Sequence, residues 1–199
     1  MHHLFATACF PPISYLKQAF ASKNICIDQH SNFQKQSIRN RYFILGPNGV
    51  QTLIIPLRHQ NLSKTPTAEV QISSEESWQH KHWQALQTAY NRSPYFEFIQ
   101  DDLYALLFNK QNNLIEFNTS FLIWASSFLE FELNICYSET FLETIENDFR
   151  NLSNQKNPLP NEHKYHQVFS YKQDFQSGLS CIDLICNLGK AANKLLTAF

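Results

Sequence analysis

The hydrophobic residues of this chain change their spacing near Ser77, and this change constrains the fold more than any other feature. Before it, short β-rich runs predominate, with one helical run over residues 13–21; after it, apolar residues recur every three or four positions. With 199 residues, 43% of them hydrophobic, the chain has the size of a single domain with a substantial core. The sequence therefore predicts one α/β domain whose second half is helical and packs on the sheet.

The N-terminal part predicts a β-α-β unit followed by a hairpin. Residues 4–10 favour a short buried strand, residues 13–21 a helix and residues 24–28 a second strand. Two further β-rich runs, 39–45 and 51–57, are separated by Gly-Pro-Asn-Gly, which is typical of a tight turn. We therefore expect a β-hairpin in the middle of the chain.

The later segments predict helices. Residues 77–91 carry an apolar stripe, and residues 140–152 also have helical spacing. A helix is expected between Ser180 and Gly189, followed by a last helical turn or two over residues 191–199. Residues 154–161, with two prolines, form the one clear break, which separates a short C-terminal segment rather than a second domain. The clearest helix carries apolar residues alternately three and four apart: Leu114, Phe117, Phe121, Trp124, Phe128 and Phe131.

Glycine is scarce, and this excludes the familiar phosphate-binding loops. With only 4 glycines, neither the dinucleotide fingerprint nor the Walker A motif can be written anywhere in the chain. No C-x-x-C pair occurs, and His163 and His166 have no apparent third ligand. We therefore expect neither a cofactor nor a metal.

The charges are strongly segregated, although the net charge is only -1. Residues 29–68 contain five basic residues and no acidic residue, whereas residues 93–149 contain ten acidic residues and a single lysine. The acidic stretch is typical of the solvated faces of helices. The acid-free stretch is therefore compatible with binding of an anionic ligand. Side chains rather than a glycine loop would hold it.

The acid-free stretch includes Arg39 and Arg41, which would point to the same face of a strand over 39–45. Two guanidinium groups so placed can grip one phosphate or carboxylate. The alternative is that they solubilise a strand end or pair with acids of the helical half. Asp28 and His30 come at the end of the second predicted strand, where ligands bind in open α/β sheets, and the alternative for them is a cap or turn.

His82 is the candidate general base, because a neutral imidazole can accept a proton near pH 7. It also shares a helical stripe with Trp78 and Leu86, so the alternative is a structural histidine whose hydrogen bonds are satisfied in the core.

Several segments together resemble the WbqC-like protein family, in order and spacing, over essentially the whole chain. They include Phe10-Pro11-Pro12-Ile13-Ser14-Tyr15-Leu16, residues 34–41, residues 44–49, Lys81-His82-Trp83 and residues 165–169. Many family members begin with a His-Gln-Pro element; here that stretch is Thr-Ala-Cys-Phe, so no role of that His and Gln carries over. The resemblance implies a role in surface-polysaccharide (O-antigen-like) or envelope metabolism, without an established reaction.

The leading hypothesis is a cytoplasmic protein, without a membrane span, that binds a small anionic metabolite such as a sugar phosphate or nucleotide sugar. Group transfer is the reaction class this favours, and the sequence leaves open whether the protein is an enzyme. The alternative is a non-catalytic interaction subunit of a biosynthetic complex. Nucleic acid is not the expected partner, and the oligomeric state is open. Besides His82 as catalytic residue, the candidate substrate contacts are Tyr15, Asp28, His30, Lys35, Gln36, Arg39, Asn40 and Arg41.

Overall fold

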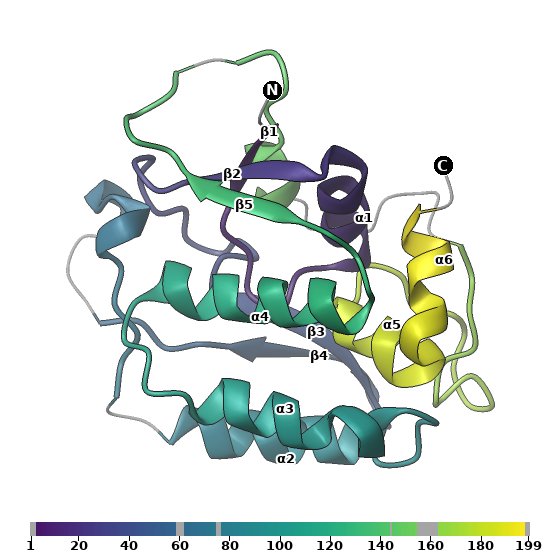
Figure 1. Ribbon diagram of the computed structural model, residues 1–199. Coiled ribbons are helices and arrows are strands. Elements are labelled where there is room, and N and C mark those ends of the chain that lie inside the picture. Colours follow the sequence, from purple (N-terminus) through teal and green to yellow (C-terminus); the bar gives the residue numbers. More distant parts are fainter. Residues whose placement is uncertain (1–2, 59–61, 75–76, 144, 155–162, 198–199) are drawn as a thin grey trace.

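A three-stranded parallel sheet forms one layer of the molecule. The computed structural model describes residues 3–58, 62–74, 77–143, 145–154 and 163–197. In the sheet, β1 (His3–Ala6), β2 (Asn24–Asp28) and β5 (Asn134–Tyr137) lie in the order β1-β2-β5 (Figure 1). Helix α1 (Ile13–Ser22) joins β1 to β2. The predicted β-α-β unit is therefore confirmed, with a first strand that ends at Ala6.

The hairpin forms a second, separate sheet. Strands β3 (Arg41–Gly46) and β4 (Gly49–Ile54) pair antiparallel, and Gly46 lies opposite Gly49 at the turn. The hairpin is confirmed, but β3 begins two residues later than predicted. Arg39 lies in the turn before it, so the argument that Arg39 and Arg41 share one strand face is wrong.

The physical reason is that the backbone before β3 has other partners. The carbonyl of Ile38 accepts from the N–H of Cys9 at 2.8 Å, and the carbonyl of Arg39 accepts from the Asn118 side chain at 2.9 Å. Asn40 contacts the β4 side, since its side-chain amide donates to the Ile55 carbonyl at 2.9 Å. These contacts turn the chain before the ladder starts.

The helical second half is also confirmed. Helices α2 (Trp78–Tyr90) and α3 (Phe96–Phe108) lie side by side below the hairpin, and α4 (Leu114–Phe128) runs between the hairpin and the parallel sheet (Figure 1). Asn113 caps α4, because its side chain accepts from the N–H groups of Ile115 and Glu116. The apolar stripe of α4 thus faces layers on both sides.

The C-terminal helices pack on the same core. Helix α5 (Cys181–Leu188) begins at Ser180, whose hydroxyl accepts from the N–H of Ile182, and ends at Gly189 with a φ of 56°. Helix α6 (Ala192–Thr197) packs against α1. Most of the predicted break at 154–161 lies outside the described residues. The buried core extends from Phe5 to Leu196 and thus includes residues on both sides of the break.

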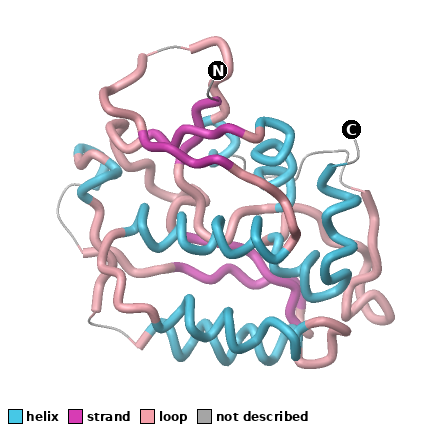
Figure 2. The backbone as a smooth tube through the Cα atoms, in the orientation of Figure 1, coloured by secondary structure: helices cyan, strands magenta, loops and turns pink. Residues whose placement is uncertain are grey.

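The helix predicted over residues 140–152 is wrong. The described residues of this segment contain no α-helix, only the start of a short 3-10 turn, η3 (Arg150–Asn154). Instead the chain extends beside β1: the carbonyl of Asn147 accepts from Leu4, and the N–H of Phe149 donates back to Leu4. Pairing with β1 has replaced local helical bonding. Figure 2 shows the segment as a long loop that returns to the edge of the sheet.

Two remaining observations concern the whole chain. All five cysteines are free; Cys26 and Cys136 are partly buried and lie opposite each other on β2 and β5. None of the described helices is both long and apolar enough to span a membrane.

Asp183, in the first turn of α5, is a buried acid with a raised pKa. Burial raises the pKa of its carboxyl to about 6, although the hydroxyl of Tyr165 donates to it at 2.6 Å and opposes the shift. The ordinary value is 3.8, so folding favours the protonated form. The resulting stabilisation is fully present below about pH 4 and is lost as the pH rises through about 6.

Replacing Asp183 by Asn, which resembles the protonated acid, is therefore expected to raise the free energy of unfolding at pH 7 by up to about 3 kcal/mol. At about pH 4 the two proteins should differ little by comparison, because the wild-type carboxyl is then largely protonated in the folded state. Urea denaturation of both proteins between these pH values measures the difference. A difference that stays constant over this range would contradict the prediction.

Candidate functional site

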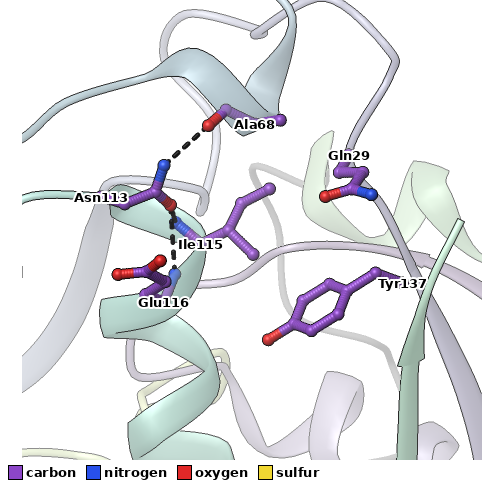
Figure 3. Close-up of a pocket in the computed structure, with 6 residues that line it drawn as sticks. All are labelled: Gln29, Ala68, Asn113, Ile115, Glu116 and Tyr137. Atoms are coloured by element: carbon purple, nitrogen blue, oxygen red, sulfur yellow. Dashed lines mark hydrogen bonds between the residues drawn. The ribbon is translucent and has the colours of Figure 1, made fainter. Parts of the chain in front are cut away.

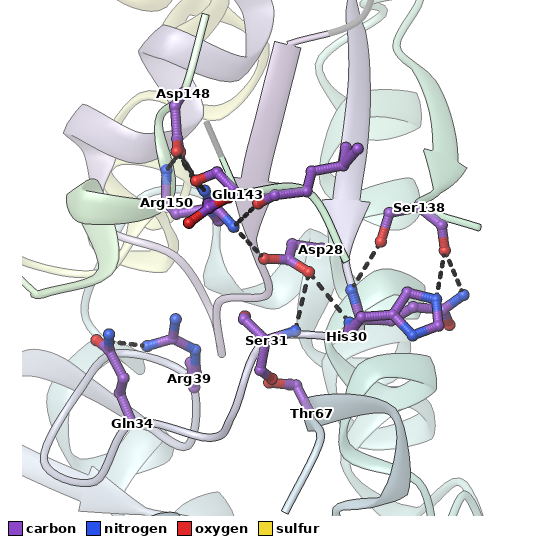
Figure 4. A network of polar contacts seen from close by, with 12 residues as sticks. Asp28, His30, Ser31, Gln34, Arg39, Thr67, Ser138, Glu143, Asp148 and Arg150 are labelled. Atoms are coloured by element: carbon purple, nitrogen blue, oxygen red, sulfur yellow. Dashed lines mark hydrogen bonds and ion pairs between the residues drawn. The ribbon is translucent and has the colours of Figure 1, made fainter. Parts of the chain in front are cut away.

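Polar residues from three parallel segments meet at the carboxyl edge of the sheet. Asp28 is the last residue of β2, and Ser138 directly follows β5. Arg150 follows a segment that runs parallel to β1, since Asp148 bridges to Leu4. Because parallel strands end at the same edge, these side chains come together there (Figure 4). The expected placement of Asp28 at a strand end is confirmed.

Arg150 is the centre of this cluster. Its Nη1 donates to Asp28 Oδ2 at 2.9 Å and its Nη2 to Asp148 Oδ2 at 2.6 Å. Its Nη1 and Nη2 also donate to the carbonyls of Leu142 and Glu143, at 2.8 Å and 3.2 Å. The side chain of Asp28 is fully buried, and that of Arg150 is 15% exposed. The guanidinium therefore ties the loop after β5 to the end of β2.

Both carboxylates of the cluster are held in the ionised form. Burial raises the pKa of Asp28, but hydrogen bonds from Arg150 and from the N–H groups of Ser31 and His30 outweigh it, so that the pKa is lowered overall. The hydrogen bond from Arg150 likewise lowers the pKa of Asp148. In turn, the Asp148 hydrogen bond raises the pKa of Arg150. The cluster is thus a charge-assisted network at neutral pH.

His30 and Asp28 shape the turn after β2. Asp28 Oδ1 accepts from the N–H groups of His30 at 3.0 Å and Ser31 at 3.1 Å. The His30 ring contacts the carbonyl of Ser138 at 3.1 Å, and Gln29 donates to the same carbonyl at 2.7 Å. This geometry favours the turn that the sequence left open as the alternative for Asp28 and His30.

Arg39 is a buried cation that forms no ion pair with any of the described residues. It is 2% exposed, and its Nη1 donates only to neutral oxygens, Gln34 Oε1 at 3.1 Å and Ser37 Oγ at 3.4 Å. Its Nε has no hydrogen-bond partner, and no carboxylate of the described residues lies within 4.0 Å of the guanidinium. Burial lowers its pKa to about 10, against the opposing influence of Asp28 and Tyr15. Arg39 is therefore charged at neutral pH.

A surface pocket of about 730 Å³ lies directly beside Arg39. Its lining includes Gln34 and Ser37, whose side chains accept hydrogen bonds from the Arg39 guanidinium, while Arg39 itself is not a lining residue. The exposed side chain of Lys35 adds a second cation. The pocket is lined by Ser31, Asn32, Phe33, Gln34, Lys35, Gln36, Ser37, Ser63 and Phe141.

A second pocket, of about 320 Å³, lies between the ends of β2 and β5 and the start of α4. Figure 3 shows the Asn113 side chain at its edge, donating to the Ala68 carbonyl. Of the described residues that line it, only the acid Glu116 is charged, so this pocket suits an anion less well than the larger one. The lining residues are Gln29, Ala68, Asn113, Ile115, Glu116 and Tyr137.

His82 lies elsewhere, on α2 against the hairpin. It is 3% exposed; its Nδ1 contacts the Tyr42 hydroxyl at 3.0 Å and its Nε2 the Ile54 carbonyl at 3.2 Å. Burial lowers its pKa to about 4. Since a carbonyl only accepts, Nε2 donates and Nδ1 accepts, which occupies both ring nitrogens. This arrangement favours the structural alternative, and His82 lines neither pocket.

The other predicted contacts divide into two groups. Lys35 and Gln36 line the larger pocket. Asn40, Arg41 and Tyr15 line neither pocket, and Tyr15 is buried with its hydroxyl donating to the Ala6 carbonyl at 2.9 Å. The structure thus places Lys35 and Gln36 in the lining of one pocket, with Arg39 hydrogen-bonded to two other lining residues, and places His82 elsewhere.

The sequence did not indicate three residues of this region: Ser138, Phe141 and Arg150. The last two fall in the segment that was predicted to be helical. One signal was present for Arg150, which is the first basic residue after Lys110 and ends the acidic stretch. A single arginine directly after ten acidic residues indicates an ion pair with one of them.

Comparison with known proteins places the chain in a family. No curated protein and no solved structure matches it. Residues 7–157 match the WbqC-like protein family, and this range contains the larger pocket, Arg39 and the Arg150 cluster. Since the match covers most of the chain, this protein belongs to the WbqC-like protein family.

Proposed function

We propose that this protein binds a small anionic metabolite of sugar type, either phosphorylated or carboxylated, in the pocket formed by residues 31–37, Ser63 and Phe141. The observation that supports the proposal is the buried charge of Arg39, whose hydrogen bonds to other described residues go to neutral oxygens of Gln34 and Ser37, two residues that line the pocket. The family context favours a cytoplasmic role in surface-polysaccharide or envelope metabolism.

The electrostatic argument concerns the cost of burying a guanidinium. A buried charge without a paired counter-charge is costly, and an anionic ligand would supply that counter-charge. Gln34 Oε1 accepts a hydrogen bond from Arg39 Nη1, and the Gln34 residue is exposed. A ligand oxygen can therefore replace Oε1 as the acceptor without leaving a buried amide unpaired. Lys35 would add a second charge at the mouth of the pocket.

The proposed reaction class rests on the family context, whereas the proposed ligand rests on the geometry of the pocket. The family context suggests group transfer, and His82 is the candidate base that the sequence indicates, although it does not line the proposed pocket. The satisfied hydrogen bonds of His82 instead favour the second candidate, a non-catalytic subunit that binds the metabolite or a protein partner within a biosynthetic complex.

Ligand binding by wild type and variants tests the proposal. Nucleotide sugars and sugar phosphates are expected to raise the melting temperature of the wild-type protein, and Lys35→Ala is expected to weaken their affinity about fivefold through loss of one charge contact. Isothermal titration at low salt measures this affinity. Lys110→Ala, an exposed lysine that does not line the pocket, is the matched control.

The proposal fails if no such anion stabilises wild type more than it stabilises a Lys35→Ala, Arg39→Met double variant. Because Arg39 is buried, the fold of the double variant must first be verified by circular dichroism. Lys35 is exposed, so the single variant remains informative even if the double variant does not fold.

A further inference from the structure

Phe141 is an exposed aromatic ring in a polar pocket. It is 60% exposed, whereas the other aromatic residue of the lining, Phe33, is 2% exposed. The remaining lining residues carry hydroxyl, amide or ammonium groups. Among the described lining residues, the pocket therefore offers a ligand one open apolar ring, set among hydrogen-bonding groups.

The backbone beside this ring is held in place by the Arg150 cluster. The two carbonyls that immediately follow Phe141, those of Leu142 and Glu143, accept from Arg150 at 2.8 Å and 3.2 Å. Arg150 is itself paired with Asp28 and Asp148 (Figure 4). A loop without α-helix or strand thus obtains a defined position next to an exposed ring, and such preorganisation lowers the cost of binding.

The chemistry of the lining matches the three parts of a nucleotide. An aromatic face stacks on a nucleobase whatever its identity, because every base has a π-face. The amides of Asn32 and Gln36 can donate to and accept from the polar edge of a base or the hydroxyls of its ribose. Lys35 and the guanidinium of Arg39 suit the phosphates. A bare sugar phosphate would leave the ring of Phe141 without a planar partner.

We infer that the ligand of this pocket is a nucleoside phosphate whose base stacks on Phe141, an inference that rests on the proposed anion site. The larger pocket, at about 730 Å³, has the size typical of small-molecule sites, roughly 300–1,000 Å³. Phe141 is then a substrate-positioning residue that selects a nucleotide over a simple phosphate ester.

Titration of the full chain with uridine diphosphate, glucose 1-phosphate and inorganic phosphate tests this inference. Phe141→Leu keeps an apolar side chain but removes the π-face, and we expect it to weaken the affinity for uridine diphosphate about tenfold, while the affinity for inorganic phosphate is unchanged. Phe141→Trp should retain binding. Phe98→Leu, at a phenylalanine that is 73% exposed on α3, is the matched control and should change nothing.

The outcomes separate the two proposals. If uridine diphosphate and phosphate bind but Phe141→Leu affects neither, the stacking role is wrong and the anion site stands. If Phe141→Leu weakens the binding of glucose 1-phosphate as much as that of uridine diphosphate, the ring contacts the sugar, and the inference that it stacks on a nucleobase is wrong. If a uridine oligonucleotide binds more tightly than uridine diphosphate, the site is for RNA. If no anion binds to wild type, both proposals fail.

Discussion

Replacing Arg150 by methionine is expected to lower the free energy of unfolding by about 3–5 kcal/mol. The substitution removes the only ion-pair partner of Asp28 in the described part of the chain and leaves its fully buried carboxylate with neutral donors alone. It also frees the carbonyls of Leu142 and Glu143. Methionine retains much of the apolar stem, so the loss reports on the charge and hydrogen bonds. Urea denaturation at pH 7 measures the change.

Two further variants identify the cause. In the Asp28→Asn, Arg150→Met double variant position 28 no longer carries a buried carboxylate without its ion-pair partner, so its stability should recover by at least about 1 kcal/mol relative to the single variant. Lys190→Met removes an ion pair with Glu130 in which both side chains are more than 60% exposed, and it should cost less than about 1 kcal/mol. Equal losses for Arg150→Met and Lys190→Met would show that the Asp28 pair does not carry the stability assigned to it.

Phe10→Ala is expected to cost about 3–5 kcal/mol of unfolding free energy. The Phe10 ring is fully buried and contacts rings from two other layers: Tyr42 of β3 at 4.6 Å, and Phe121 and Phe117 of α4 at 4.3 Å and 5.8 Å between centroids. Its removal leaves a cavity where the parallel sheet, α4 and the hairpin meet. Chemical denaturation followed by fluorescence and by circular dichroism measures the loss.

The comparison for Phe10 is Phe98→Ala. The Phe98 ring is 73% exposed, so its truncation should change the stability by less than about 0.5 kcal/mol. Phe10 has a φ of 40°, which Ala tolerates no better, so relief of backbone strain does not offset the cavity. A cost for Phe10→Ala below about 1 kcal/mol would mean that the layers repack without this ring.

The role of Phe10 also explains part of the resemblance to the family. The Phe-Pro-Pro segment lies at a junction: Phe10 fills the core, the Pro11 carbonyl accepts from Cys181 at 2.8 Å, and Pro12 directly precedes α1. Here the motif joins the start of α5 to the start of α1. Its residues line neither pocket, so in this segment the shared sequence reflects architecture rather than ligand binding.

The sequence by itself determined the elements whose stability is local. Helix α4 can be recognised from the 3.6-residue period of its apolar residues alone. The Gly46–Gly49 turn can be recognised from the backbone preferences of its own residues. Asp28 was placed correctly because a strand end is visible in the sequence. Lys35, Gln36 and Arg39 were recognised as candidates because they share an acid-free segment.

Only the tertiary structure decided which of these residues act together. Asp28 and Arg150 are 122 positions apart and meet because two parallel segments end at one edge of the sheet. The sequence around His82 looks the same for a general base as for a structural histidine. Its contacts with Tyr42 and Ile54 favour the structural role. Residues 140–152 have helical spacing, but pairing with β1 and the hydrogen bonds of Arg150 stabilise a loop. A local pattern cannot report such partners, because burial and ion pairing depend on segments that become neighbours only on folding.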